Sequence, residues 1–483
     1  MRLTDLAHRR VYVAPANPAG RDLARRLGHA GAEVLGLMDN FKRGVGIING
    51  AAEAESFDYA VVAPGEAQAV ICEGLMGRGF PARTLLTAMT DDTFRPYRRR
   101  WSVRLGRLRG RLRSGLFRLA RRMVSQKGTV YYAEGFFDSN VLLAYRHHRA
   151  VHGKEARLVG FDAPPPPGCV ADQPGVWLNR PMTGWWPLVR AARLVVDHEA
   201  TSDRFACLRA AVPVVQLWHG LPYKALAGNG HYEHVRDAAF LSSSAWFNRH
   251  VFPGMFRAAR YEALGYPRCD ALIQPRIDRP WEVSVSRERL EAVLADTGPL
   301  WVYMPTFRDA DPTRAGLDLD WAEGLAARHG RSLVLKYHPF VARAVQDALD
   351  LPLTDDLLPL PGYPHLYLFP GGRDPYPWLA EAECLITDYS SVAFDFLVCD
   401  RPIVYYQFDR DAYQAVRGAA AVPDSLFIAG PVARDRADLA AALADVAAGQ
   451  DGYARTRRDL RRRLELVDRP ATPAIVDFIR EIA

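Results

Sequence analysis

Two histidines in short motifs are the residues of this chain best suited to chemistry. His219 stands in Trp-His-Gly, and His338 stands in Lys-Tyr-His-Pro about 120 residues further on. The pKa of a free imidazole is about 6.5, so a neutral histidine can accept a proton from a hydroxyl group near neutral pH. A single histidine is more often structural, but two in comparable motifs predict that both take part in a reaction.

A third segment offers a place where phosphate could bind. The apolar run at 384–386 predicts a buried strand, and residues 392–399 predict a helix with an apolar face. Asp388, Ser390 and Ser391 lie between them and are of types that commonly cap helices. The first turn of such a helix presents unpaired N–H groups and the positive end of its dipole, which favours an anion. The alternative is an ordinary capped helix; together with the histidines, the segment favours a phosphotransferase.

These motifs need a scaffold that brings them together, and the order of predicted elements supplies one. Strands alternate with helices after residue 128, which predicts parallel sheets. A first series of strands is predicted at 129–133, 157–160, 194–197, 213–217 and 239–242. A second series is predicted at 301–304, 333–337, 366–369, 384–386 and 403–406. The sequence therefore predicts two parallel-sheet domains, one after the other.

Four polar residues follow predicted strands: His219, Arg308, His338 and Asp388. Ligands of parallel sheets bind beyond the carboxyl ends of the strands. We therefore expect these four side chains to line one cleft.

Residues 1–90 predict a smaller sheet of the same kind. Strands at 10–13 and 32–37 flank a helix at 21–28, which is typical of half a Rossmann fold. Asp39 stands where such folds often place a ribose-binding acid, but the turn before the helix has one glycine where the dinucleotide fingerprint needs three. A structural or regulatory domain is therefore favoured over nucleotide binding.

The positive charge of the chain is concentrated in one segment. Residues 95–127 contain 13 of the 62 basic residues and no acid, which leaves 49 basic against 55 acidic residues elsewhere. Wound as a helix, the segment would place a set of apolar residues within an arc of roughly 80°. These are Trp101, Leu105, Leu108, Leu112, Leu116, Leu119 and Met123.

An apolar stripe on a cationic helix is what an anionic membrane surface binds, because the leucines enter the acyl boundary and the arginines meet headgroup phosphates. We therefore expect residues 101–123 to contact such a surface. The alternatives are a helix docked on the protein's own core and a basic arm that touches RNA. The segment lacks an aromatic-rich nucleic-acid motif, so no nucleic-acid partner is expected.

Composition sets the remaining limits. A chain of 483 residues predicts about three domains. The N-terminus lacks the apolar core of a signal peptide, and no stretch approaches the roughly 20 apolar residues of a spanning helix, so we expect a cytoplasmic protein. The six cysteines include no Cys-x-x-Cys pair, so neither a zinc site nor a disulfide framework is expected. We also expect no metal and no cofactor.

Six motifs stand in order along the chain. They are Gln-Leu-Trp-His-Gly-Leu-Pro-Tyr-Lys at 216–224, Gly-Tyr-Pro-Arg-Cys-Asp at 265–270, Met-Pro-Thr-Phe-Arg-Asp at 304–309, Lys-Tyr-His-Pro at 336–339, Thr-Asp-Tyr-Ser-Ser at 387–391 and Arg-Pro at 401–402. In this order they resemble the CDP-glycerol glycerophosphotransferases of teichoic-acid and capsule synthesis. The resemblance covers roughly residues 129–420.

The resemblance implies an α/β fold, in which a GT-B-like pair of Rossmann-type domains follows the small Rossmann-like N-terminal domain. We expect domains at 1–92, 129–285 for the acceptor and 286–483 for the nucleotide donor, with the basic segment at 93–128. It further implies catalytic roles for His219 and His338. The substrate-binding residues that it implies are Gly220, Lys224, Arg268, Thr306, Arg308, Lys336, Thr387, Asp388, Tyr389, Ser390 and Ser391.

The chemistry also fits these residue types. A polyol hydroxyl must attack the phosphorus that bears glycerol in CDP-glycerol and expel CMP, which needs a base and groups that stabilise charge on the phosphates. We assign His219 as the general base and His338 as the group that stabilises the transferred phosphate or the leaving CMP. Arg308, Lys336 and the amides of the 387–391 turn suit the diphosphate.

The sequence departs from the family pattern in several places. The family more often has Thr-Pro-Leu after the first His-Gly, Trp at Phe307, Leu at Tyr337 and Asn at Cys269, so the acceptor and the exact polyol stay open.

The expected function is transfer of glycerol phosphate from CDP-glycerol to a hydroxyl of a membrane-linked or cell-envelope glycan, on the cytoplasmic face of the membrane. Three alternatives stay open: a GT-B enzyme that uses a nucleotide sugar, a relative that uses CDP-ribitol, and an inactive membrane-associated scaffold.

Overall fold

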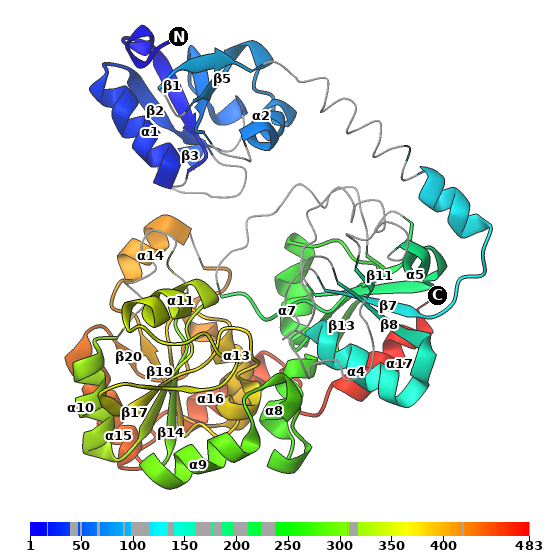
Figure 1. Ribbon diagram of the computed structural model, residues 1–483, viewed down its shortest axis with the longest axis vertical. Coiled ribbons are helices and arrows are strands. Elements are labelled where there is room, and N and C mark those ends of the chain that lie inside the picture. The colour runs from blue at the N-terminus through cyan, green and yellow to red at the C-terminus, as the bar shows by residue number, and fades with distance from the viewer. Residues whose placement is uncertain are drawn as a thin grey trace. The chain divides into compact units, whose positions relative to one another are not determined.

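The protein forms two compact units (Figure 1). The first contains one six-stranded sheet, and the second contains two seven-stranded sheets. The structure, a computed structural model, describes residues 1–16, 18–38, 47–48, 51–64, 68–89, 92–97, 112, 115–133, 140–160, 176–177, 185–197, 211–223, 237–306, 308, 317–417 and 420–482.

The first unit is a Rossmann-like sheet with the strand order β3-β2-β1-β4-β5-β6, parallel except for the last pair. Its strands are β1 (Arg10–Ala14), β2 (Glu33–Met38), β3 (Ile47–Ile48), β4 (Tyr59–Val62), β5 (Leu85–Ala88) and β6 (Phe94–Pro96), with helices α1 (Pro18–His29) and α2 (Gln68–Gly77). The chain adds β2 and β3 on one side of β1 and then β4, β5 and β6 on the other, as in Rossmann-type sheets. Asp39 lies outside the described residues.

The second unit begins with the sheet that carries the first histidine, in the order β13-β12-β11-β10-β7-β8-β9. Its strands are β7 (Thr129–Ala133), β8 (Ala156–Gly160), β9 (Val176–Trp177), β10 (Arg193–Val196), β11 (Val214–Gln216), β12 (Ala239–Ser242) and β13 (Tyr261–Ala263). Its helices are α4 (Asn140–His152), α5 (Trp185–Arg190), α7 (Ala245–His250) and α8 (Asp270–Ile273). All its strand pairs are parallel.

The third sheet, in the same unit, has the order β16-β17-β15-β14-β18-β19-β20. Its strands are β14 (Leu300–Tyr303), β15 (Ser332–Leu335), β16 (Leu358–Leu360), β17 (Tyr363–Leu368), β18 (Cys384–Thr387), β19 (Ile403–Tyr406) and β20 (Val432–Ala433). The helices that follow in this half of the chain are α9 (Arg287–Thr297), α10 (Leu319–His329), α11 (Pro339–Ala348), α12 (Tyr376–Leu379), α13 (Val392–Phe396), α14 (Arg410–Arg417), α15 (Arg436–Ala447), α16 (Ala454–Arg463) and α17 (Thr472–Glu481).

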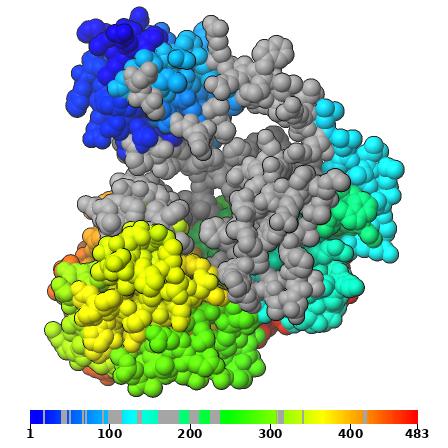
Figure 2. Space-filling view, in the orientation of Figure 1, coloured from blue at the N-terminus to red at the C-terminus, as the bar shows by residue number. Residues whose placement is uncertain are grey.

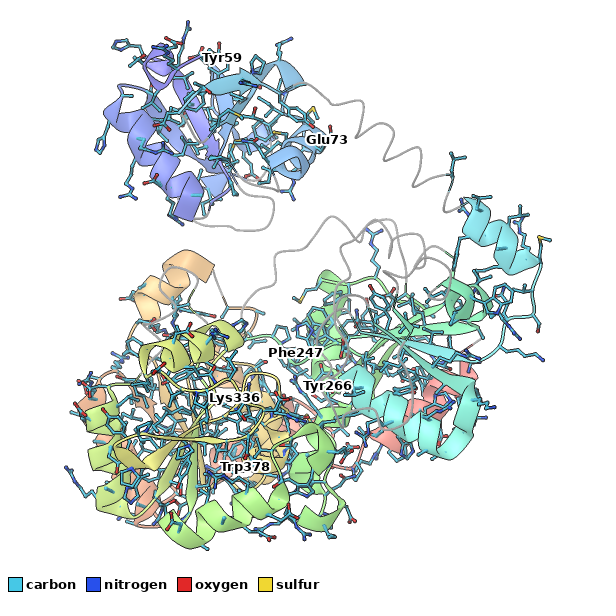
Figure 3. All side chains as sticks on the ribbon, viewed as in Figure 1. Tyr59, Glu73, Phe247, Tyr266, Lys336 and Trp378 are labelled. Atoms are coloured by element: carbon cyan, nitrogen blue, oxygen red, sulfur yellow. The ribbon has the colours of Figure 1, made fainter. Side chains whose placement is uncertain are left out.

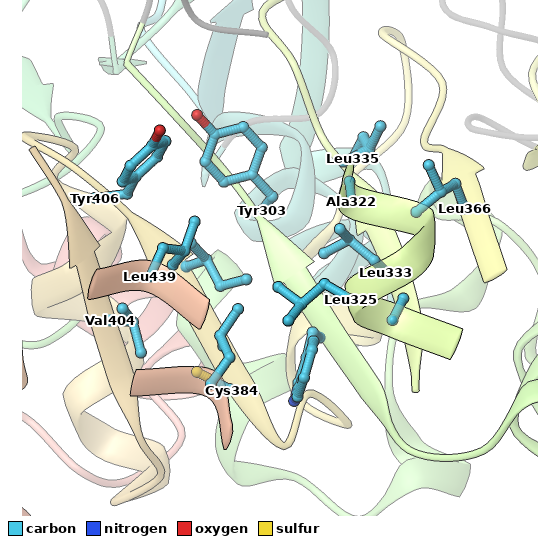
Figure 4. Close-up of a cluster of buried hydrophobic side chains, with 14 of the residues drawn as sticks. Tyr303, Ala322, Leu325, Leu333, Leu335, Leu366, Cys384, Val404, Tyr406 and Leu439 are labelled. Carbon is cyan, nitrogen blue, oxygen red and sulfur yellow. The ribbon is translucent and has the colours of Figure 1, made fainter. Parts of the chain in front are cut away.

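Local sequence signals set the element ends here. The Asp318 side chain accepts a hydrogen bond from the Trp321 amide and so caps α10, which ends at Gly330 in the left-handed conformation that glycine adopts without strain. The central strands are buried on both faces, which explains their continuous apolar runs. Figure 4 shows side chains from β14, β15 and β18 meeting those of α10 and α15 in one apolar cluster.

The ten strands predicted in these two sheets are all present, each within a few residues of its predicted ends. The sequence missed the short edge strands β9, β13, β16 and β20, because two or three residues carry too little pattern to be recognised. Apart from the antiparallel pair β16–β17, the pairs of the third sheet are parallel, as predicted.

The last helix returns to the second sheet. Ile475, Phe478 and Ile479 of α17 pack in the core that α4 and the strands of that sheet form, and α17 lies beside α4 in Figure 1. The domain bounds 129–285 and 286–483 stay a prediction. Helix α17 belongs by sequence to the domain at 286–483 but packs on the domain at 129–285.

The end of the basic segment is docked on the second sheet by one face of a helix. Residues 115–122 are helical, with Phe117 buried in a core cluster of that sheet. Nη1 of Arg121 donates to three backbone oxygens at the end of α5. The opposite side exposes apolar residues: Leu112, Leu116, Leu119 and Met123 are 54–78% exposed. Trp101, Leu105 and Leu108 lie outside the described residues.

Candidate active site

His219 follows strand β11 in an unusual backbone conformation. Trp218 before it has a φ of 55°, and Gly220 after it has a φ of 138°. The Trp218 carbonyl accepts a hydrogen bond from the Asn140 side chain, and its amide donates to the side chain of Gln216. These bonds hold a turn that a tryptophan rarely adopts, and such conformations cluster at functional sites.

The orientation of the His219 ring fixes where its lone pair lies. Nδ1 is 2.9 Å from the backbone oxygen of Asp197. A carbonyl oxygen can only accept, so Nδ1 carries the proton and donates it to this bond, and the lone pair of the neutral ring lies on Nε2. The ring is half-buried against Trp218, with 4.0 Å between the ring centroids. This is the tautomer that a general base needs.

Residues from three sequence motifs meet at Gly220. A Cβ atom on this glycine would lie 3.0 Å from Nη2 of Arg268 and 3.1 Å from Oγ of Ser391. The contact brings the His-Gly motif, the Gly-Tyr-Pro-Arg motif and the Thr-Asp-Tyr-Ser-Ser turn together, although they come from the second and third sheets. The close approach explains why glycine follows the histidine.

Arg268 is itself held by residues that follow strands of the third sheet. Its Nη2 donates to Asp395 of α13 at 2.6 Å, and the Tyr376 hydroxyl donates to the same carboxylate at 2.5 Å. Its guanidinium also lies 4.9 Å from the centre of the Tyr376 ring. Tyr266, labelled in Figure 3, is buried beside this group. Asp395 is 3% exposed, so the ion pair is shielded from solvent.

Asp388 links two strand ends of the third sheet. Its carboxylate accepts hydrogen bonds from the amide and hydroxyl of Thr306, at 2.7–3.1 Å, and from the Tyr389 amide. Arg308 makes an ion pair with Asp388 at 2.8 Å and two hydrogen bonds with Asp409 at 2.8 and 3.0 Å. Asp388 therefore ties Thr306 and Arg308 to the 387–391 turn instead of capping a helix.

The pairing of Arg308 bears on its predicted role. Burial lowers its pKa, but the hydrogen bonds with Asp409 and the charge of Asp388 outweigh this and place the pKa above its ordinary value. Two carboxylates already neutralise the guanidinium, which is 6% exposed. Its contact with a diphosphate stays a prediction, and its contacts in the structure are those of a residue that positions Asp388 and the turn.

The helix after the turn is shorter than the sequence suggested. Helix α13 covers five residues and continues as a 3-10 turn at Leu397–Cys399. Ser391 is the N-cap residue of this helix, but its side chain accepts no capping hydrogen bond. Ser390 Oγ accepts a long bond from the Val392 amide at 3.4 Å. Both hydroxyls belong to the turn, and Thr387 donates to the backbone oxygen of Met304.

Lys336 and His338 stand at the adjacent strand end. The Lys336 amide donates to Tyr303 of β14, next to β15, and its Nζ lies 3.4 Å from a backbone oxygen of Pro370. His338 is exposed at the start of α11. Partial burial and the positive charge of Lys336 lower the pKa of His338, so its ring is neutral at pH 7 and can donate one N–H.

Two residues that the sequence did not single out join this group. Tyr223 donates to Asp424 at 2.8 Å and stacks on Phe427 with a centroid distance of 3.9 Å and on Tyr389 with one of 6.3 Å. Asp409 follows β19 and would have been found by the rule used for Asp388, which looks just past the end of each buried strand. Tyr223 had no signal beyond its place in the first motif.

The structure therefore brings most of the predicted residues to one region. Gly220, Arg268 and Ser391 touch, Thr306, Arg308 and Asp388 form a second group, and the 387–391 turn joins the two. Lys336 and His338 stand at the neighbouring strand end. Lys224 lies outside the described residues. Among the residues that are described, no cluster of histidine, cysteine and acidic side chains could hold a metal ion.

Comparison with known proteins gives the family. The profile of the family described as CDP-Glycerol:Poly(glycerophosphate) glycerophosphotransferase matches residues 174–481. The teichoic acid glycerol-phosphate transferase of Staphylococcus aureus (strain NCTC 8325 / PS 47) is 26% identical over 224 residues, 41% of this chain and 53% of that protein. The teichoic acid poly(glycerol phosphate) polymerase of Bacillus subtilis (strain 168) is 26% identical over 333 residues, 62% of this chain and 41% of that protein. The matched part of the chain thus spans about half the length of these relatives or less.

A solved structure of the wall teichoic acid polymerase TagF superimposes with a TM-score of 0.57 at 19% identity, over 78% of this chain and 97% of that one. This likeness shows a shared fold and confirms the predicted fold class. Because the family profile matches well over half of the chain, the protein belongs to the CDP-glycerol:poly(glycerophosphate) glycerophosphotransferase family.

Proposed function

We propose that this protein transfers glycerol phosphate from CDP-glycerol to a hydroxyl group of a membrane-linked or cell-envelope glycan, with release of CMP. The observation that carries the proposal is the contact of Gly220 with Arg268 and Ser391. Gly220 follows His219, the candidate base, and Ser391 belongs to the 387–391 turn, the candidate phosphate site. The contact therefore brings the two parts of the site together. Family membership supports the donor, since the family description names CDP-glycerol.

The proposed reaction is an in-line displacement at phosphorus. Nε2 of His219 takes the proton of the acceptor hydroxyl while that oxygen attacks the phosphorus that bears glycerol. The bond from this phosphorus to the bridging oxygen breaks, and CMP leaves with the electron pair. Negative charge on the phosphate oxygens is stabilised by N–H groups of the turn at Ser390 and Ser391, and by Lys336 and His338.

The two histidines have different surroundings that suit different roles. His219 has its Nδ1–H held by a backbone oxygen, which leaves Nε2 as the basic atom. His338 has a lowered pKa beside a lysine, so it is a neutral donor rather than a fixed cation. In this proposal His219 moves the proton, and His338 donates an N–H to the transferred phosphate or the leaving CMP.

We further propose that the protein works on the cytoplasmic face of an anionic membrane, to which residues 101–123 bind. The described part of this segment supports the idea, because Leu112, Leu116, Leu119 and Met123 are exposed along one side of the chain. A helix docked on the core through this stripe would bury them instead. None of the described helices is both long and apolar enough to pass through a membrane.

The donor is tested with a panel of nucleotides. Purified protein is incubated with CDP-glycerol, CDP-ribitol or UDP-sugars and an acceptor analogue that ends in glycerol phosphate, and release of CMP or UDP is followed by chromatography. We expect CMP from CDP-glycerol, and at least about 10²-fold slower release from the His219→Ala protein. Turnover of UDP-sugars alone would indicate a nucleotide-sugar enzyme, preference for CDP-ribitol would correct the polyol, and no release from any donor would indicate a scaffold.

A further inference from the structure

A cavity lined by basic residues lies at the amino ends of the strands in the sheet that carries His219. Its volume is about 510 Å³, within the range of small-ligand pockets. Thr129, Arg157 and Arg193, which line it, stand at the amino ends of β7, β8 and β10. His219 follows the carboxyl end of a parallel strand in the same sheet, so the cavity is separate from the candidate active site.

The cavity is strongly cationic. The basic residues that line it are Lys127, Lys154, Arg157, Arg190 and Arg193. Among its described lining residues, Glu155 is the one acid, and its carboxylate lies 3.4–4.0 Å from Arg193, Arg480 and His148. For the other four cations, no carboxylate of the described chain lies within ion-pair distance. Such an excess of positive charge favours an anionic ligand.

Two buried polar atoms of the cavity wall have no hydrogen-bond partner in the described structure. They are Oγ1 of Thr129, a residue 1% exposed, and Nε of Arg193. A buried hydroxyl or N–H left without a partner destabilises the folded state, so such groups usually meet a ligand or water. Thr129 and Arg193 thus leave one hydroxyl and one N–H donor without a partner behind the cavity wall, beside its diffuse charge.

The cavity adjoins the helix whose leucines are exposed. Arg121 of that helix bonds the backbone of Leu188, Val189 and Ala191, and the Lys127 amide bonds the carbonyl of Arg190. In Figure 2 the helix at 115–122 and the segment at 185–197 lie side by side on the surface. Trp186, in the wall of the cavity, is 54% exposed, so an exposed aromatic ring and the exposed leucines belong to the same part of the protein. Apolar side chains beside a cationic pocket suit a lipid with an anionic headgroup.

We propose that this cavity binds the phosphate ester of an anionic membrane lipid. Lys127, Lys154 and Arg157 supply charge, and the Thr129 hydroxyl donates to a phosphate oxygen. The exposed leucines and Trp186 enter the acyl boundary beside it. The inference rests on the membrane contact in the proposed function, but not on the identity of the transferred group.

The first test is vesicle binding of the full-length protein. Vesicles of phosphatidylcholine with phosphatidylglycerol should bind the wild type, and the triple change Lys127→Gln, Lys154→Gln and Arg157→Gln should weaken binding by roughly fivefold for each cation removed. The matched control removes three exposed arginines of α16, by Arg455→Gln, Arg462→Gln and Arg463→Gln, and should bind like the wild type. Equal losses in both triple variants would overturn the pocket in favour of general electrostatic attraction.

The second test separates a built pocket from diffuse charge. Thr129→Val removes only the unpartnered hydroxyl, so the melting temperature should hold or rise, while affinity for phosphatidylglycerol vesicles falls by roughly fivefold. Unchanged affinity would overturn the assigned hydroxyl contact. A lower melting temperature with unchanged affinity would show that the hydroxyl is structural.

A third arm distinguishes the source of the phosphate. Glycerol 3-phosphate and inorganic phosphate are titrated by calorimetry without vesicles. Saturable binding that the pocket variants lose, without vesicle binding by the wild type, would overturn the lipid and assign a soluble phosphate ester. CMP release with a soluble acceptor analogue should stay unchanged in all pocket variants. Vesicle binding with the expected variant pattern but no transfer would contradict the proposed function alone.

Discussion

The turn at His219 is an uncommon backbone conformation that neighbouring side chains hold in place. Trp218 has a positive φ, which costs roughly 1 kcal/mol or more for a residue with a side chain. The Asn140 and Gln216 side chains hold it there, and the next residue can then turn sharply because it is glycine. The result places an imidazole, with its lone pair on Nε2, beside the Arg268 and Ser391 contact.

His219→Ala should reduce turnover by about 10² to 10⁴, because the proton of the acceptor hydroxyl loses its base. Affinity for CDP-glycerol should change little, since the imidazole acts on the acceptor. Steady-state kinetics and calorimetry measure the two quantities separately. His338→Ala is the matched comparison and should weaken donor binding too. Turnover within a few-fold of wild type would remove His219 from the mechanism.

Lys336→Gln should raise the pKa of His338. Burial and the lysine charge both lower this pKa, and removal of the positive charge favours the imidazolium form. His338 would then stay protonated up to a higher pH, and the imidazolium would still donate an N–H to the phosphate. Titration of the histidine ring signals by NMR gives the pKa directly. An unchanged value would show that the imidazole does not sense Lys336.

At the scale of elements, the ends of β14, β18 and β19 are joined by one buried charge network. Asp388, Arg308 and Asp409 each lie on a different strand end. A buried arginine between two carboxylates is costly to break, because each loss leaves an unpaired charge. The network therefore keeps the 387–391 turn in one conformation.

Arg308→Ala should lower both stability and donor affinity, since two buried carboxylates lose their partner at a cost of roughly 3 to 5 kcal/mol. The double change Ser390→Ala and Ser391→Ala should lower donor affinity with little effect on stability. Calorimetry with CDP-glycerol and thermal melting distinguish the two. Donor affinity unchanged in both proteins would place the diphosphate elsewhere.

Helix α4 carries a histidine that should make the fold sensitive to acid. Burial lowers the pKa of His148 to about 4, and its Nδ1 lies 2.8 Å from the Tyr131 hydroxyl. The unfolded chain binds a proton at this residue near pH 6.5, but the folded chain binds it only near pH 4. The free energy of unfolding should therefore fall as the pH drops through this window, by up to about 3 kcal/mol.

Denaturant titrations across this pH range measure the effect. His148→Gln should flatten the dependence, because glutamine keeps a polar contact for Tyr131 and does not titrate. The control His250→Gln changes an exposed histidine and should leave the slope as in the wild type. Equal slopes in all three proteins would show that His148 is not the group responsible.

At the scale of the whole molecule, the apolar stripe predicts membrane binding that leaves the active site intact. The triple change Leu112→Glu, Leu116→Glu and Leu119→Glu should release the protein from anionic vesicles while sparing transfer to a soluble acceptor analogue. These side chains are exposed, so the melting temperature should change little. Flotation measures vesicle binding.

The matched control for the stripe is the pair Ile277→Glu and Leu353→Glu, which are also exposed apolar residues of the same unit and should not affect flotation. Aggregation or a large drop in melting temperature from the leucine changes would support a stripe that is buried against the protein itself. Binding also depends on charge, so it should weaken as salt is added.

Much of the fold could be predicted because parallel strands are buried on both faces and leave unbroken apolar runs, as at Leu300–Tyr303 and Cys384–Thr387. The rule that ligands bind past such strands located His219, His338 and Asp388. The sequence could not show that Asp409 neutralises Arg308, because nothing local links two residues 101 positions apart. It also could not show that α17 packs on the second sheet, since an amphipathic helix does not specify its partner.

The return of α17 has a mechanical consequence. The chain passes between the halves of the second unit near Gly265–Asp270 and again before Thr472. The two passages touch: a Cβ on Gly265 would lie 2.5 Å from that of Ala471, and the Asp270 carboxylate accepts hydrogen bonds from the amides of Ala471 and Thr472 at 2.6 and 2.9 Å. Two adjacent segments of the chain therefore join the halves of the second unit at one place.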